Sequence, residues 1–286
     1  MWGMALASLH RAVDALAVWS EDLVLRPPEP CRLCAPEPLR CFGALPALPT
    51  PAPGARAWSV ASPLPLRDGD RLTVRVTPAS GRRRGTALLV PPWKIRTPQL
   101  VSGYARLLAA AGLDAWLPSP PHHLERAAPG ARSGEGYVSL DLARLRAVVE
   151  QQVAELRACA ALAARTGPVG LVGLSLGALT GALAATGLER LAFAALVAPP
   201  SLASVMAETG IGRRYRALAI RAGSRWPAPE ALAEALAPLD PAERRPTAAR
   251  LAVAAGLHDR IALPAGPLAL ARAWRVEPWL YRRGPM

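Results

Sequence analysis

The segment VGLVGLSLGALTGALAA, residues 169–185, carries the clearest structural signal in the chain. Residues 169–172 are apolar and predict a buried parallel strand, while residues 178–185 predict a helix. Between them, Gly173-Leu174-Ser175-Leu176-Gly177 predicts a turn so sharp that the serine backbone is strained and its hydroxyl stands clear of the sheet. Gly173 and Gly177 suit this turn because larger side chains would collide as the chain reverses. The alternative is a glycine-rich turn whose serine has no role.

Predicted strands and helices alternate on both sides of this segment. Strands are expected at residues 71–77, 86–90, 113–117, 191–197 and 250–255, with a short final strand within 276–281. Helices are expected at 97–111, 139–165 and 267–274, the second of them capped by Ser139. The turn at 81–85 looks like a hairpin with Arg82-Arg83-Arg84 at its tip. This alternation predicts an α/β fold with a mostly parallel sheet covered by helices on both faces, and it places Ser175 at the carboxyl edge of the sheet, where ligands bind.

The chain is expected to have an N-terminal extension and one main domain. Residues 1–57 comprise a predicted amphipathic helix within 4–25, which contains His10, and a proline-rich arm. The main domain spans 58–286, and within it residues 201–247 predict short helices without a strand. Those helices would form a small cap above the serine. The cap side chains Met206, Ile211, Tyr215 and Trp226 indicate only that a pocket beneath them would be partly apolar.

The composition is that of a globular protein. Hydrophobic residues make up 51% of the 286 residues, which is ample for a core. No apolar stretch reaches the length of a membrane span without a charge or a proline, so no transmembrane helix is expected. The N-terminus lacks the basic region of a secretory signal, which favours a cytoplasmic location.

The net charge of +13 does not by itself indicate a nucleic-acid partner. The arginines are scattered as pairs rather than gathered in one stripe interleaved with aromatic residues. Arginine far outnumbers lysine, as expected from the codons of a GC-rich genome. Solvated surface is therefore the main interpretation, and nucleic acid is not expected as a partner. Attraction to an anionic substrate or to a membrane surface is the alternative.

The cysteines do not complete a metal site. Cys31, Cys34 and Cys41 have spacings that resemble part of a zinc or redox site, but no fourth cysteine or histidine lies close by. A proline-rich packed arm is the preferred interpretation, and Cys159 is expected to be a small core residue. No metal ion and no other cofactor is expected.

The strand, the Gly-Leu-Ser-Leu-Gly turn and the helix together resemble the nucleophile elbow of the α/β-hydrolase superfamily. The resemblance covers roughly residues 58–286, and the nearest branch looks like the esterases and dienelactone-hydrolase-like proteins. It implies a serine hydrolase that acts on a small, partly apolar ester, thioester or lactone through an acyl-Ser175 intermediate. It implies nothing about the oligomeric state.

The resemblance also implies roles for individual residues. Ser175 would be the nucleophile, and Asp259, which follows the strand 250–255 and Gly256, would be the acid of the triad. The backbone N–H groups of Leu176 and Trp93 would bind the oxyanion, with Lys94 next in line because Pro91 and Pro92 have no N–H. The alternatives are that Asp259 pairs with Arg260 or is solvated, and that Trp93 fills the core.

The histidine of such a triad is missing from its usual place. It should follow the last strand, but that slot falls on Gly284-Pro285, and no histidine lies beyond His258. The side chain of His258 should diverge from that of its neighbour Asp259. His122 and His123 are expected to line the pocket or to face solvent, with a substitute base as the alternative. The chain is therefore interpreted as a serine hydrolase by descent, and a truncated form or a non-catalytic ligand-binding or regulatory relative remain open.

Overall fold

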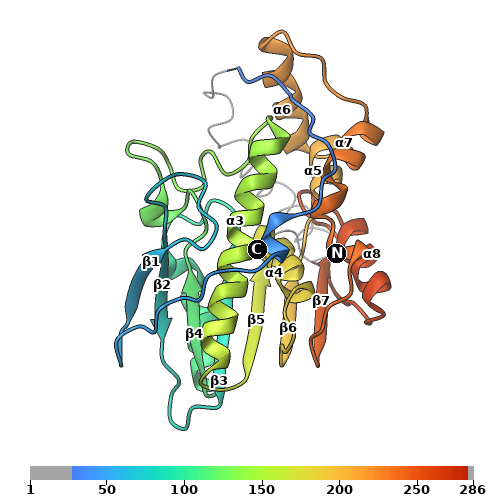
Figure 1. Ribbon diagram of the computed structural model, residues 1–286. Coiled ribbons are helices and arrows are strands. Elements are labelled where there is room, and N and C mark those ends of the chain that lie inside the picture. The colour runs from blue at the N-terminus through green and yellow to red at the C-terminus, as the bar shows by residue number, and fades with distance from the viewer. Residues whose placement is uncertain (1–27, 283–286) are drawn as a thin grey trace.

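The computed structural model describes residues 28–282. The predicted helix within 4–25, with His10, and the Gly284-Pro285 slot lie outside the described residues. Figure 1 shows a single sheet with helices packed in front of it and behind it.

The sheet has eight strands in the order β1-β2-β4-β3-β5-β6-β7-β8. Their bounds are Ala57–Ala61 (β1), Arg71–Thr77 (β2), Gly85–Val90 (β3), Leu113–Pro118 (β4), Val169–Leu174 (β5), Phe193–Val197 (β6), Leu251–Gly256 (β7) and Trp279–Tyr281 (β8). The pairings of β1 with β2 and of β2 with β4 are antiparallel, and every pairing from β4 to β8 is parallel. The prediction of a mostly parallel sheet is therefore confirmed.

The helices follow the predicted alternation. Their bounds are Ser102–Ala110 (α2), Leu142–Ala164 (α3), Leu176–Thr186 (α4), Leu202–Glu208 (α5), Gly210–Arg221 (α6), Pro229–Leu236 (α7) and Ala265–Trp274 (α8). Short 3-10 turns occur at Arg40–Phe42 (η2), Pro98–Val101 (η3), Leu124–Arg126 (η4), Ala237–Leu239 (η5) and Pro241–Glu243 (η6).

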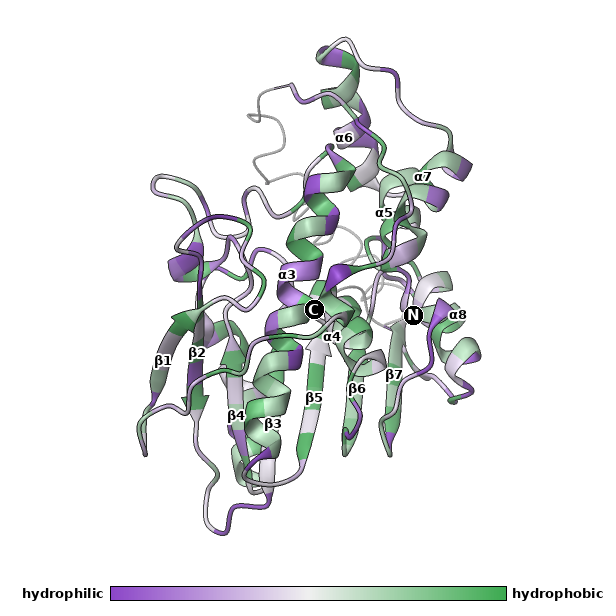
Figure 2. Ribbon diagram, in the orientation of Figure 1, coloured by the Kyte–Doolittle hydropathy of each residue, from purple (hydrophilic) through white to green (hydrophobic). Residues whose placement is uncertain are grey.

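Apolar side chains from both faces of the sheet form the core. All six residues of β3 are buried, as expected for a central parallel strand with helices on both sides. Leu88 and Val90 belong to the larger core cluster with α3 and α4, whereas Leu89 packs into a smaller cluster with Val101 and Ala105 beside α2. Figure 2 shows the central strands coloured predominantly hydrophobic. Successive side chains of β3 thus point alternately into the two core clusters, one on each face of the sheet.

The predicted hairpin at Arg82–Arg84 is wrong. β2 pairs with β1 and β4, and β3 lies on the other side of β4, so the two strands flanking this turn are not neighbours. The connection from β3 through α2 is a parallel crossover, which returns the chain to the sheet as β4 beside β3. Arg83 is not merely solvated, because its Nε lies 2.6 Å from Asp114 Oδ2 and its Nη1 donates to the Thr166 carbonyl.

The predicted cap of the long helix is also wrong. α3 begins at Leu142, and the side chain of Asp141 accepts a hydrogen bond from the Arg144 N–H at 3.3 Å. The Ser139 hydroxyl instead donates to Glu29 Oε1 at 2.6 Å, which ties the arm to the start of the helix. Serine and aspartate are both good N-cap residues, so the residue types alone did not separate the two positions.

Two segments lie outside the alternating strands and helices. Residues 28–56 contain only η2 as a helical turn, and they pack on α3 through the buried Leu39, Cys41 and Leu48. Residues 201–247 contain α5, α6 and α7, which Figure 1 shows beyond the carboxyl ends of β5–β7. The cap side chains Met206, Ile211 and Tyr215 are buried in the main core, while Trp226 is partly buried against it. These side chains therefore mainly pack the helices of residues 201–247 against the rest of the domain.

The four cysteines are free thiols. Burial, with a contribution from Glu29, raises the pKa of Cys31 to about 11, and burial together with Glu150 raises the pKa of Cys41 to about 12. Within residues 28–282, no three His, Cys, Asp or Glu side chains are arranged to hold a metal ion. In the same range, no helix has the length and apolar character needed to cross a membrane.

Candidate active site

Ser175 lies in a strained turn between β5 and α4. Its backbone has φ 51° and ψ −120°, a conformation that non-glycine residues rarely adopt. The turn is held by the Ser175 N–H, which donates to the Val197 carbonyl at 2.8 Å, and by the Ala178 N–H, which donates to the Ser175 carbonyl at 2.7 Å. The side chain is partly exposed, and its hydroxyl makes no hydrogen bond within residues 28–282. The hydroxyl is thus held at the carboxyl edge of the sheet without a structural partner.

Glycines on both sides allow this turn to close. A Cβ at Gly177 would lie 2.3 Å from the Val90 carbonyl oxygen and 2.4 Å from that of Pro91. A Cβ at Gly173 would lie 2.5 Å from the Gly177 carbonyl oxygen. These contacts are with backbone atoms, which cannot move aside as the end of a side chain can, so the turn and the loop after β3 pack too closely for any larger residue.

Replacing Gly177 with alanine is expected to destabilise the fold by about 3 kcal/mol, because the added methyl group forces two backbone segments apart. The measurement is the free energy of unfolding from urea titration. Gly103→Ala is the matched control, because Gly103 is exposed in α2 and an added Cβ there meets nothing within 4 Å. That variant should keep or slightly exceed native stability. Equal unfolding midpoints for the two variants would contradict the steric explanation.

Two of the backbone N–H groups predicted to bind the oxyanion have no hydrogen-bond partner among the described residues. Leu176 is the first residue of α4, and its N–H has no hydrogen-bond partner among the described residues. The Trp93 N–H is likewise unpaired within the described part of the chain, although its indole Nε1 donates to the Gly134 carbonyl at 3.0 Å. The Lys94 N–H donates to His123 Nε2 at 2.9 Å and is therefore occupied. Of the three predicted donors, Leu176 and Trp93 stay candidates.

Asp259 is a buried carboxylate with one free oxygen. Only 3% of the residue is exposed. Its Oδ1 accepts hydrogen bonds from the N–H groups of Ile261 and Ala262, both at 2.8 Å, whereas the buried Oδ2 has no partner among residues 28–282. Burial raises the pKa of Asp259, and the two backbone donors oppose that rise. The alternatives of a salt bridge with Arg260 and of a solvated side chain are therefore wrong.

Ser175 and Asp259 lie on the same edge of the sheet but not in contact. Ser175 directly follows β5, Asp259 follows β7, and β6 lies between those strands. Neighbouring strands are about 4.8 Å apart, so two steps separate the strand ends by about 10 Å. A third group is needed to connect the serine hydroxyl with the free Asp259 oxygen.

Tyr281 lies near Asp259 at the end of β8. Burial, followed by the Asp259 carboxylate and Tyr104, raises the pKa of Tyr281 to about 12. Its hydroxyl is buried without a hydrogen-bond partner in the described structure. With this pKa the phenol stays protonated near neutral pH, so it is a potential donor and not a base. The sequence did not single out Tyr281, because an aromatic residue in a final strand is ordinarily a packing residue.

The expectation that His123 lines the pocket or faces solvent is wrong. The side chain is fully buried and stacks edge-on against Tyr137, with the ring centres 5.4 Å apart. Its Nε2 accepts from the Lys94 N–H, and its Nδ1 lies 2.8 Å from the Pro121 carbonyl oxygen, to which it therefore donates. Burial lowers the pKa of His123 to about 4. With both ring nitrogens used, His123 stabilises the loop.

The other described histidines do not connect Ser175 with Asp259. His122 lines a cavity beside the loop between β1 and β2. His258 is half-buried and makes no hydrogen bond to Asp259. Among residues 28–282, no imidazole is hydrogen-bonded to either member of the Ser175–Asp259 pair.

Comparison with solved structures shows that the chain has the α/β-hydrolase fold, as the sequence predicted. An acetyl xylan esterase from Paenibacillus sp. R4 has a TM-score of 0.54 and 15% identity, with 87% of this chain and 84% of that chain covered. An esterase from Thermogutta terrifontis has a TM-score of 0.51 and 15% identity, with 82% and 85% covered. No protein-family model matches the sequence, and no curated protein is significantly similar to it. At such identities the likeness establishes the fold alone.

Proposed function

We propose that the chain is a serine hydrolase that cleaves an ester, thioester or lactone through an acyl-Ser175 intermediate. The observation that carries the proposal is the strained Ser175 turn, which presents an unpaired hydroxyl beside the free N–H of Leu176. Backbone strain of this kind is retained where the surrounding structure enforces it, and such sites are commonly functional. The esterases that share the fold support the substrate class by analogy.

The proposed reaction has two steps. In the first, the Ser175 oxygen attacks the carbonyl carbon while its proton passes to a base, and the N–H groups of Leu176 and Trp93 bind the resulting oxyanion. The carbon–oxygen or carbon–sulfur bond of the substrate then breaks, and the leaving group departs as its anion or takes up that proton. In the second, water attacks the acyl-Ser175 ester, which releases the carboxylic acid and restores the serine hydroxyl. Asp259 is proposed as the acidic partner, with its unpartnered Oδ2 as the oxygen that would accept a hydrogen bond from the base.

The lack, within residues 28–282, of an imidazole bonded to Ser175 or Asp259 affects the choice of substrate. A triad histidine normally protonates the leaving group, and no described imidazole is hydrogen-bonded to Ser175 or Asp259 to do so. A leaving group that departs as a stable anion does not need this proton. Activated esters and thioesters are therefore proposed as better substrates than esters of simple alcohols.

A leaving-group series tests this proposal. Phenyl thioacetate and p-nitrophenyl acetate should be hydrolysed far faster than ethyl acetate, and intact-mass spectrometry after rapid quenching should detect one acetyl group on the protein. Because the chain has four histidines, His→Gln variants at His10, His122, His123 and His258 would reveal any imidazole that serves as the base. A folded protein that neither turns over nor acquires an acetyl group would contradict the proposal.

A non-catalytic relative that binds a ligand is the second candidate. The observation that favours it is the absence, within the described chain, of an imidazole hydrogen-bonded to Ser175 or Asp259. Removing the base of a serine triad alone costs on the order of 10^6 in turnover. Reversible binding of an ester without its cleavage would favour this candidate.

A further inference from the structure

A polar cavity of about 320 Å³ lies away from Ser175. It is bounded by the loop between β1 and β2, the loop after β4, and α3. Its charged and polar lining includes Arg67, Asp70, Arg71, His122, Arg126 and Gln151. Its volume is at the lower end of the range for small-molecule sites. Along the sheet, β4 and β3 separate β2 from β5, so this cavity is distinct from the Ser175 turn.

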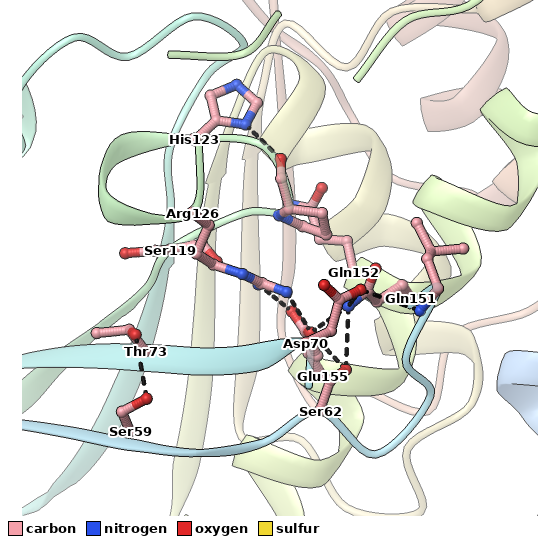
Figure 3. A network of polar contacts seen from close by, with 12 residues as sticks. Ser59, Ser62, Asp70, Thr73, Ser119, His123, Arg126, Gln151, Gln152 and Glu155 are labelled. Carbon is pink, nitrogen blue, oxygen red and sulfur yellow. Dashed lines mark hydrogen bonds and ion pairs between the residues drawn. The ribbon is translucent and has the colours of Figure 1, made fainter. Parts of the chain in front are cut away.

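One wall of the cavity is held by a buried ion pair. The Arg126 guanidinium donates to both carboxylate oxygens of Glu155, at 2.7 and 2.8 Å, and the two side chains are 8% and 2% exposed. The Ser62 hydroxyl also donates to Glu155, at 2.7 Å. Figure 3 shows these side chains converging with Asp70 and Gln151 in one network. The polar groups of this wall are therefore fixed before any ligand arrives.

The cavity has an excess of positive charge. Arg126 is neutralised by Glu155, and Glu125 is paired with Arg75 at 2.8 Å. The remaining charges of the lining are Asp70 and the exposed guanidinium groups of Arg67 and Arg71. Asp70 Oδ2 already accepts from the N–H groups of Leu66 and Arg67, and Arg71 donates to the hydroxyl and the carbonyl of Ser59 at 3.0 and 2.8 Å. Two cations therefore outnumber one occupied carboxylate, which favours an anionic ligand.

His122 lies in the lining of the same cavity, near several of these charges. Burial is the largest cause of the lowering of its pKa to about 4, and Arg144, Arg67 and Arg126 lower it further. The negative charge of Asp70 acts in the opposite direction and raises the pKa of His122. The His122 ring makes no hydrogen bond within residues 28–282, so its nitrogens are available to a ligand.

Gln151 supplies an unsatisfied acceptor. The residue is 1% exposed, and its Nε2 donates to Ser62 Oγ, Asp70 Oδ2 and Glu155 Oε1 at 3.1–3.3 Å. These acceptors fix the orientation of the amide, and Oε1 is left buried without a partner in the described structure. A buried unpaired acceptor is destabilising, and a hydroxyl that donates to it would remove this cost.

We propose that this cavity binds a small hydroxylated carboxylate or phosphate. Its anionic group would pair with Arg67 and Arg71 at the mouth, and its hydroxyl groups would donate to the Gln151 carbonyl and contact His122. The site needs neither Ser175 nor Asp259, so it stands or falls independently of the hydrolase proposal.

Isothermal titration of the full chain with four compounds tests the site. D-Gluconate is a hydroxylated carboxylate and glucose 6-phosphate is a hydroxylated phosphate, so the two show which anionic group the site prefers. Glucose has the hydroxyl groups without the charge, and hexanoate has the charge without the hydroxyl groups. At least one of the first two should bind about tenfold or more tighter than both glucose and hexanoate. The bound anion should also raise the pKa of His122 in an NMR titration, because it stabilises the imidazolium. The proposal would be overturned if neither gluconate nor glucose 6-phosphate binds more tightly than glucose and hexanoate, or if neither binds at millimolar concentrations.

Matched variants distinguish a specific anion site from the general attraction of anions to a basic protein. Arg67→Met and Arg71→Met should each weaken binding of the preferred anion by about tenfold. Arg82→Met is the control, since Arg82 is an exposed arginine in the turn between β2 and β3 at the opposite edge of the sheet. Ser175→Ala should bind the anion as the native chain does. If Arg82→Met weakens binding as much as Arg67→Met, only non-specific attraction is present.

Discussion

Replacing Ser175 with alanine is expected to lower the hydrolysis of p-nitrophenyl acetate by a factor on the order of 10^4. The reason is that the acyl group then has no oxygen to which it can be transferred. We expect somewhat less than the 10^6 lost in a complete serine triad, because p-nitrophenolate leaves without the proton that a triad histidine would supply. The measurement is kcat/KM from initial rates, with folding checked by circular dichroism.

Ser80→Ala is the matched control for this experiment. Ser80 is exposed after β2, at the edge of the sheet away from Ser175, and its side chain makes no hydrogen bond within residues 28–282. Its loss should leave kcat/KM unchanged. If Ser175→Ala retains the native rate, ester cleavage takes place elsewhere on the protein and the acyl-Ser175 proposal is wrong.

Glu155→Gln is expected to destabilise the fold by about 3–5 kcal/mol, because it leaves the buried Arg126 guanidinium without its counter-charge. Glu155 accepts hydrogen bonds from Arg126, Ser62 and Gln151, and neutralising it weakens all of them at once. The measurement is the free energy of unfolding in urea at neutral pH.

The same substitution at Glu125 provides the comparison. The Arg75–Glu125 pair is just as close, at 2.8 Å, but its side chains are 36% and 32% exposed. Solvent screens such a pair, so Glu125→Gln should cost about 1 kcal/mol or less. Similar losses for the two variants would show that burial does not control the strength of these ion pairs here.

The sheet could be predicted because the apolar pattern of each strand is visible in its own local sequence. The apolar runs that became β3 and β5 are buried on both faces, and a buried parallel strand is typically an uninterrupted apolar segment. The sharp turn at Ser175 could be predicted in the same way, because the close backbone contacts of the turn require glycine at positions 173 and 177.

Pairing between distant residues could not be predicted in the same way. Whether β2 lies beside β3 or beside β4 depends on the crossover through α2 and not on the turn residues themselves. His123 looks like a pocket residue by its place after β4, yet contacts with Lys94 and Pro121 bury it. The Arg126–Glu155 pair joins positions 29 residues apart, and neither position has a local pattern that indicates burial.

Treatment of the full chain with a fluorophosphonate, followed by intact-mass and peptide analysis, tests most directly whether Ser175 is a nucleophile. Fluorophosphonates phosphonylate serines that a protein activates, and an ordinary surface serine such as Ser80 does not react. We expect one adduct per chain, located on the peptide that contains Ser175, and none in Ser175→Ala. A correctly folded chain that stays unlabelled, or that is labelled at another residue, would contradict the assignment.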